Sequence, residues 1–137
     1  MPENSRKKEL KLMQEPVRVT GMVLEVSPVG ETDRRVVLLT KERGKISAFA
    51  RGARKQGSRL MAATNPFCFG EFILYEGRNS YSLSEAVIRN YFEDMRMHFE
   101  EACYGMYFLE LMDYYTRENN DEREMLLLLY QSLRALL

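Results

Sequence analysis

The hydrophobic pattern of this chain changes once, near Tyr91, and the change limits what the chain can fold into. Before it, short runs rich in β-branched and aromatic residues alternate with turn-forming residues, which is typical of strands joined by turns. After it, apolar residues recur three and four positions apart, as they do on a helix. Strands first and helices afterwards indicate an α+β protein.

Five strands are predicted in the first part of the chain, at residues 17–26, 34–40, 45–51, 67–75 and 81–89. Residues 27–30 have the composition of a turn, and Gly44 is expected to supply the positive φ of a hairpin turn. Gly21 and Gly70 lie inside strands, where glycine often marks a bend or a bulge. The pattern predicts a small closed or nearly closed β-barrel over 17–90, with a short helical turn at 60–63.

Two helices are predicted to follow the barrel as a helical hairpin. The first, at 95–116, is apolar over much of its circumference, so its Tyr, Phe and Met side chains are expected in the core. Asp121 and Glu124 have the spacing of a capping box, which predicts the start of the second helix. That helix is apolar nearly all round and needs cover on several sides. We therefore expect a flexible extension at 1–16, the barrel at 17–90 and an incomplete helical domain at 91–137.

The sequence favours a cytoplasmic protein with no membrane segment. It contains no run of 18 or more apolar residues, and its N-terminus lacks the apolar core of a signal peptide. Cys68 and Cys103 are too few for a disulfide framework or a zinc site, and both are interpreted as buried free thiols.

Positive charge is concentrated in residues 34–59 of a chain that is neutral overall. One acidic residue, Glu42, lies there among nine basic ones: Arg34, Arg35, Lys41, Arg43, Lys45, Arg51, Arg54, Lys55 and Arg59. Strand-forming residues separate these cations, so they are expected on a folded surface, which is typical of a nucleic-acid site. A solvated hairpin rich in Lys and Arg is the alternative. Residues 91–137 have a net charge of −6 and are not expected to approach a phosphate backbone.

A basic β-barrel favours an oligonucleotide-binding (OB) fold, whose cations neutralise phosphates while aromatic side chains stack on bases. Phe49 alternates with Lys45 and Arg51 along the third strand, so it is a candidate stacking platform. The alternative is that Phe49 packs against the helical hairpin. Tyr75 and Tyr81 are further candidates, although such residues are more often cross-strand pairs.

Motifs for catalysis or for a cofactor are not recognised. The segment GARKQGSR at 52–59 resembles a phosphate loop, but Ser58 stands where that loop requires Lys. His98 is the only histidine and has no partners nearby in sequence. Glu31 and Asp33 are interpreted as residues that shape a turn. We therefore expect no enzyme, no metal and no cofactor.

Several segments in a fixed order resemble the N-terminal part of the RecO family of bacterial DNA-repair proteins. They are VTGMVL at 19–24, GETD at 30–33, LLTKERGKISAFARGARKQGSR at 38–59, PF at 66–67 and YFLEL at 107–111. The resemblance implies a five-stranded OB-fold barrel followed by a truncated helical domain. It also implies that the basic residues of the second and third strands and the following loop form a DNA surface.

The resemblance further implies binding of single- and double-stranded DNA and annealing of complementary strands. It implies joint action with RecR and with the single-stranded DNA-binding protein in loading RecA, as in recombination mediators of the RecF pathway. Family members are longer than this chain, so we expect an N-terminal fragment with an incomplete site for the single-stranded DNA-binding protein. A protein-interaction adaptor and an RNA-binding OB-fold protein are the alternative functions.

Overall fold

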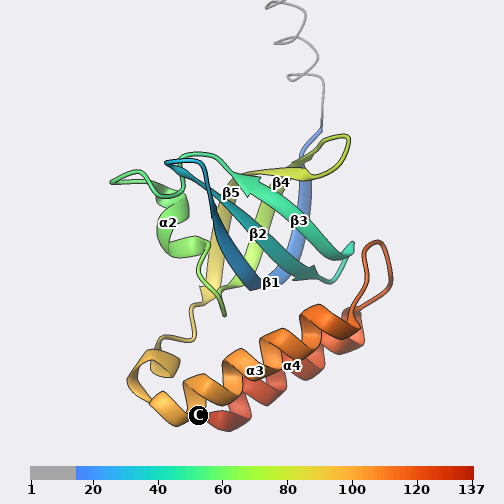
Figure 1. Ribbon diagram of the computed structural model, residues 1–137. Helices are drawn as coiled ribbons and strands as arrows, with labels where there is room; N and C mark the ends of the chain where they lie inside the picture. Colours follow the sequence, from blue (N-terminus) through green and yellow to red (C-terminus); the bar gives the residue numbers. More distant parts are fainter. Residues whose placement is uncertain (1–14) are drawn as a thin grey trace, which may run out of the picture.

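The computed structural model describes residues 15–137, which form a five-stranded barrel and a helical region below it (Figure 1). The elements of the barrel are β1 (Val17–Val29), β2 (Asp33–Thr40), β3 (Gly44–Ala50), α2 (Arg59–Ala63), β4 (Phe69–Glu76) and β5 (Tyr81–Asn90). The helical region contains a 3-10 helix, η1 (Glu93–Met97), and the helices α3 (Phe99–Tyr115) and α4 (Arg123–Leu136). Within residues 15–137 no helix combines the length and the apolar character needed to cross a membrane.

The barrel is closed in the strand order β1-β2-β3-β5-β4. Neighbouring strands are antiparallel except β3 and β5, which pair in parallel at Ala48–Tyr81 and Phe49–Ser82. This is the topology of an OB-fold, so the predicted α+β class and five-stranded barrel are confirmed. The inward side chains form one core cluster, centred on large residues such as Phe72, Leu74 and Leu38.

Strand β1 pairs with two neighbours, and glycines make that double pairing possible. Gly21 is opposite Thr40 of β2 and also opposite Gly70 of β4. A Cβ atom on Gly21 would lie 2.5 Å from the carbonyl oxygen of Leu39, closer than real Cβ contacts. A Cβ atom on Gly70 would collide with the backbone of Val87. Only glycine allows the strands to approach this closely, as expected at the bend of a small barrel.

Helices α3 and α4 cover the lower end of the barrel (Figure 1). A second apolar cluster fills this junction; its buried members are Met22, Leu24, Val37, Leu39, Phe67, Phe92, Met95, Leu109, Leu126, Leu129 and Leu133. The turn between β2 and β3 also contacts the connection between α3 and α4. Gly44, with φ of 66°, forms a β-bridge with Glu118, and a Cβ atom there would collide with the backbone of Asn120.

Several predicted boundaries are corrected by the structure. The fourth strand begins at Phe69 and not at residue 67, since Phe67 has a φ of 75°, and the third strand ends at Ala50, so that Arg51 directly follows it. Strand β1 continues to Val29 through the predicted turn, because Pro28 occupies an exposed position opposite Arg34. The first long helix begins at Phe99, since η1 and an extended His98 precede it. The predicted capping box is wrong, because the N-cap residue of α4 is Glu122, and its side chain makes no capping hydrogen bond. The part of the predicted N-terminal extension before residue 15 lies outside the described residues.

The predicted burial of the first long helix is also wrong. Only Gly105 and Leu109 of α3 are buried, because the barrel and α4 cover one narrow side of it. Aromatic residues such as Tyr107 and Tyr114 are exposed. Cys103 on this helix is exposed too, contrary to the prediction of two buried thiols. Cys68 is buried in the barrel core as predicted, and that burial raises the pKa of its thiol.

The junction cluster predicts a contrast between two neighbouring leucines of α4. Leu129→Ala removes a fully buried side chain and is expected to lower the free energy of unfolding by about 2–5 kcal/mol. Leu128→Ala removes a side chain that is 51% exposed, and the expected change is within about 0.5 kcal/mol. Urea unfolding followed by circular dichroism measures both values; equal losses would mean that α4 does not seal the barrel end as described.

Candidate nucleic-acid interface

The outward face of β3 presents the aromatic residue that the sequence singled out. Ile46, Ala48 and Ala50 are buried in the barrel, so the side chains between them point outward, as the predicted alternation requires. Phe49 is 39% exposed, so its ring is accessible to solvent on the outer face of β3.

Phe49 lines a groove that crosses three strands, which we call the β3 groove. Its volume is about 450 Å³, and its lining residues are Phe49, Arg51, Tyr75, Glu76, Gly77, Ser82, Leu83 and Ser84. Strand pairing explains the arrangement, because Ser82 of β5 lies opposite Phe49 of β3 and also opposite Tyr75 of β4. None of the lining residues belongs to α3 or α4, so the groove does not support packing of Phe49 against the helical hairpin.

Arg34 is one of the nine predicted cations, and its partly buried guanidinium is held by hydrogen bonds within the protein. One of its nitrogens, Nη1, donates to the carbonyl oxygen of Met61 at 2.9 Å, to Oγ1 of Thr64 at 2.9 Å and to Oδ1 of Asn65 at 3.3 Å. These bonds tie β2 to α2 and to the segment after it. Arg34 is therefore placed to stabilise the fold.

Arg54 is held in a similar way, together with Asp33. Its guanidinium donates to the carbonyl oxygens of Asp33 at 3.0 Å and Gly30 at 2.6 Å. The backbone N–H of Gly52 donates to the Asp33 carboxylate at 2.7 Å, and that bond is the main reason why the pKa of Asp33 is lowered. Asp33 thus shapes the backbone as predicted, although it fixes the loop after β3 as well as the start of β2.

Two further cations have acidic partners. Nζ of Lys45 lies 3.2 Å from the carboxylate of Asp113 and also donates to the Asp113 carbonyl oxygen, which links β3 to α3. Nη1 of Arg43 lies 3.8 Å from the Glu76 carboxylate and 3.4 Å from the hydroxyl oxygen of Tyr81. Tyr81 therefore contacts Arg43 and does not line the β3 groove.

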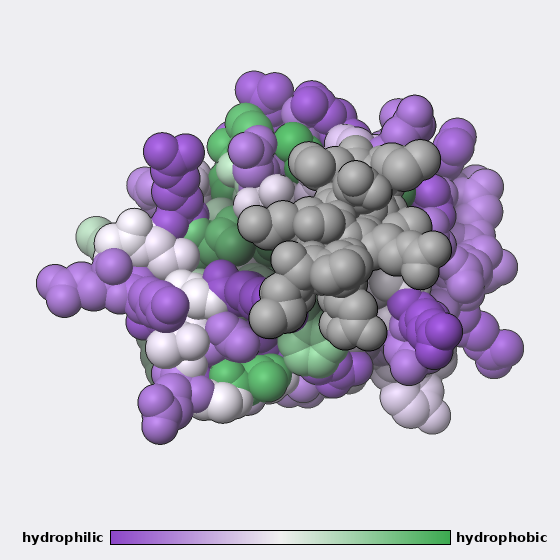
Figure 2. Space-filling model, turned by 90° about the horizontal axis from the view of Figure 1, so that it is seen from above, coloured by the Kyte–Doolittle hydropathy of each residue, from purple (hydrophilic) through white to green (hydrophobic). Residues whose placement is uncertain are grey.

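The other five cations of the basic stretch are exposed and, within residues 15–137, make no side-chain hydrogen bond or ion pair. They are Arg35, Lys41, Arg51, Lys55 and Arg59. Arg35 is the cross-strand partner of Phe49, and Arg51 lines the β3 groove beside it, so two of these cations flank the exposed ring. In the view from above, most of the visible outer edge of the molecule is hydrophilic (Figure 2).

The structure also shows what the sequence did not reveal about this surface. Ser82 and Ser84 line the groove, but they come from β5, whose parallel pairing with β3 is not signalled by any local pattern.

His98 is exposed, and its Nδ1 lies 3.0 Å from the carbonyl oxygen of Asp94. Among the described residues, no group of three or more His, Cys, Asp or Glu side chains is arranged to hold a metal ion.

Comparison with known proteins places this chain beside DNA-repair proteins. The model of the family described as "Recombination protein O N terminal" matches residues 13–92. "DNA repair protein RecO" of Alkaliphilus metalliredigens is 33% identical over 120 residues, which are 88% of this chain and 49% of that protein. The protein of the same name from Bacillus pumilus is 36% identical over 120 residues, 88% of this chain and 47% of that protein. The chain thus spans about half the length of the curated relatives it matches.

The two adjacent arginines of β2 are expected to differ in their effect on stability. Arg34→Ala leaves three acceptors without their donor, and because the site is partly exposed we expect a loss of about 1–2 kcal/mol in the free energy of unfolding. Arg35→Ala removes an exposed side chain, with an expected change within about 0.5 kcal/mol. Chemical denaturation of both variants tests this, and a larger loss for Arg35→Ala would contradict the assignment.

Proposed function

This chain belongs to the RecO family of DNA-repair proteins, and from that premise we propose that it binds DNA through the outward face of β3 and promotes the annealing of complementary strands. The observation that carries the proposal is the position of Phe49, an exposed ring in a groove, with Arg35 beside it across the strand pair and Arg51 in the same groove. Stacking of a base on the ring and neutralisation of phosphates by the arginines together form a site for single strands without sequence preference.

The distribution of the free cations supports a path for the DNA backbone. Arg35 lies on β2, Arg51 directly follows β3, and Lys55 and Arg59 belong to the loop after β3 and to the start of α2. The loop is held by the contacts of Asp33 and Arg54, so Arg51 and Lys55 are presented from a fixed backbone. A strand that crosses the β3 groove would therefore continue along this loop.

Annealing requires no catalytic group under this proposal. Two complementary strands repel each other through their phosphates, and a surface that neutralises part of that charge lowers the cost of bringing them together. Stacking holds bases without using their hydrogen-bonding edges, so the bases stay available for pairing. Double-stranded DNA, in which the bases are already stacked, is expected to bind through the cations alone.

The wider cellular role is part of the same proposal. We infer that the chain acts in recombinational repair as a mediator, with RecR and the single-stranded DNA-binding protein as partners in loading RecA, inside the cytoplasm at the nucleoid. These finer assignments rest on the family and not on any contact described above. A lack of affinity for DNA would favour the alternative of a protein-interaction adaptor. Tighter binding of RNA than of DNA would favour the alternative of an RNA-binding protein.

Binding of a labelled single-stranded DNA oligonucleotide, followed by fluorescence anisotropy at several salt concentrations, tests the charged part of the site. Each neutralised phosphate contributes a slope of about −0.7 in the logarithm of affinity against the logarithm of salt. The variant Arg35→Glu/Arg51→Glu/Lys55→Glu is expected to weaken binding more than about tenfold and to reduce the slope by about 2.

A matched control separates the proposed site from an effect of net charge. The variant Arg96→Glu/Arg117→Glu/Arg134→Glu makes the same change in charge at exposed residues of the acidic helical region. We expect its affinity and salt slope to stay close to those of the unchanged chain. Equal weakening by the two variants, both shown to be folded by circular dichroism, would refute the assignment of the site.

Phe49→Ala tests the stacking part of the site. Loss of one stacked base is expected to cost about 1–3 kcal/mol, or about 5- to 150-fold in affinity for single-stranded DNA, with little effect on duplex DNA. Tyr91→Ala is the control, since Tyr91 has similar exposure (38% against 39%) and lies outside the β3 groove. If Phe49→Ala weakened single-stranded and duplex binding alike, Phe49 would not act by stacking.

A further inference from the structure

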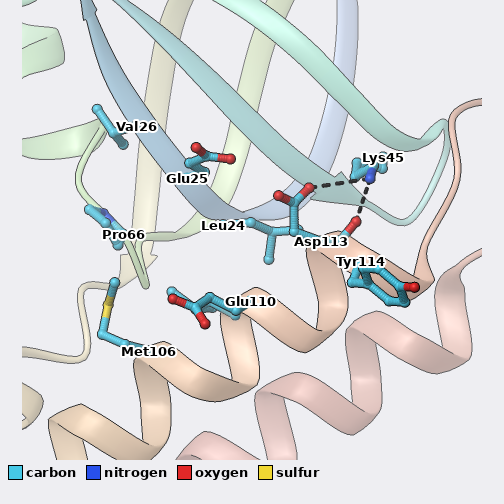
Figure 3. Close-up of a pocket in the computed structure, with 10 residues that line it drawn as sticks. Leu24, Glu25, Val26, Lys45, Pro66, Met106, Glu110, Asp113 and Tyr114 are labelled. Atoms are coloured by element: carbon cyan, nitrogen blue, oxygen red, sulfur yellow. Dashed lines mark hydrogen bonds and ion pairs between the residues drawn. The ribbon is translucent and has the colours of Figure 1, made fainter.

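A second cleft lies between β1 and α3, on residues that the proposed DNA site does not use (Figure 3). Its volume is about 610 Å³, compared with about 450 Å³ for the β3 groove. Leu24, Glu25 and Val26 of β1 form one wall, and Met106, Glu110 and Tyr114 of α3 form the opposite wall. Lys45 and Asp113, joined by their ion pair, close one end (Figure 3).

The walls of this cleft follow from local backbone geometry. The pairing of β1 with β2 shifts between Val23 and Glu25, which marks a β-bulge at Leu24. The bulge leaves Leu24 buried in the junction cluster while Glu25 is exposed toward the cleft. On α3, Met106, Glu110 and Tyr114 are spaced four residues apart, so they form a single stripe along the helix that faces the bulge.

The charge of the cleft is negative and not compensated locally. Lys45 forms an ion pair with Asp113, with 3.2 Å between its Nζ and the carboxylate oxygen Oδ1. Glu25 and Glu110 are both exposed, and neither has a cationic partner among the residues that the structure describes. Two carboxylates across one cleft repel each other and attract a cation placed between them, and the same charge disfavours a phosphate backbone.

The cleft is also apolar in part, which narrows the class of cation that fits it. Met106 is 41% exposed and Tyr114 is 80% exposed, so both offer apolar surface at the opening. Arginine and lysine carry a charged tip on an apolar stem, and arginine in particular packs on the faces of aromatic rings. A small inorganic cation would use the carboxylates but would leave this apolar surface exposed to water.

We propose that this cleft is a docking site for a segment of a partner protein that presents an arginine or lysine next to apolar side chains. The cationic tip lies between Glu25 and Glu110, and the apolar neighbours pack on Met106 and Tyr114. The cleft shares no lining residue with the β3 groove, so DNA and the partner segment occupy different surfaces. The inference goes beyond the proposed DNA binding and does not depend on it.

The probe for this proposal is a short fluorescein-labelled peptide in which leucine and arginine alternate, compared with a twin that has the uncharged citrulline in place of arginine. The arginine peptide is expected to bind with saturation, and the citrulline twin at least about tenfold more weakly, a difference of ~1.4 kcal/mol. Glu25→Gln/Glu110→Gln is expected to weaken binding of the arginine peptide by about the same factor.

Two controls distinguish the cleft from general attraction of a cation to an acidic region. Glu100→Gln/Glu124→Gln makes the same change in net charge at exposed residues that do not line the cleft, and it should leave the affinity within about twofold. In methyl NMR spectra the peptide should shift the signal of Met106 and leave that of Met97, which is 79% exposed outside the cleft, unchanged. Absence of saturable binding up to about 1 mM, equal losses in both double variants, or shifts at Met97 without shifts at Met106 would each overturn the proposal.

Discussion

The double pairing of β1 is the constraint on which the rest of this structure depends. A strand of 13 residues pairs with β4 along its first part and with β2 along its second, and the two pairings overlap at Gly21 and Met22. The overlap requires a backbone approach that Gly21 and Gly70 alone permit. Closure of the barrel aligns β3, β5 and β4 so that Phe49, Ser82 and Tyr75 meet on the outer surface.

The cations of the basic stretch form two groups, those that hold the fold together and those that are exposed to solvent, and composition alone does not show which cation belongs to which group. Four of its nine cations form hydrogen bonds or ion pairs within the protein: Arg34, Arg43, Lys45 and Arg54. These contacts fix the loop after β3 and attach the barrel to the helices. The remaining cations project into solvent from the backbone that the first four hold in place. Net charge alone therefore overstates the number of groups available to a polyanion.

Local patterns predicted the elements well, and non-local contacts explain the failures. The period-two alternation of β3 and the positive φ of Gly44 followed from the sequence, because each depends on nearby residues. The burial of α3 did not follow, since it depends on how much of the helix the barrel covers. In the same way, Arg34 and Arg35 are adjacent residues of the same type, so the local sequence does not show that they have different roles. The difference comes from α2 and the segment after it, about thirty residues away, which accept hydrogen bonds from Arg34. The residue types of the basic stretch do not show which of its cations have partners within the protein.

The strict alternation along β3 also limits how proteins of this kind can vary in length. Insertion of one residue between Ile46 and Ser47 would reverse the facing of the rest of the strand, turning the positions of Ala48 and Ala50 outward and that of Phe49 into the barrel. Such a change would damage the core and the candidate site together. The exposed tip of the following loop, around Gln56 and Gly57, carries no comparable restriction. Differences in length among related proteins are therefore expected at that tip, where they would alter the reach of the surface without altering the barrel.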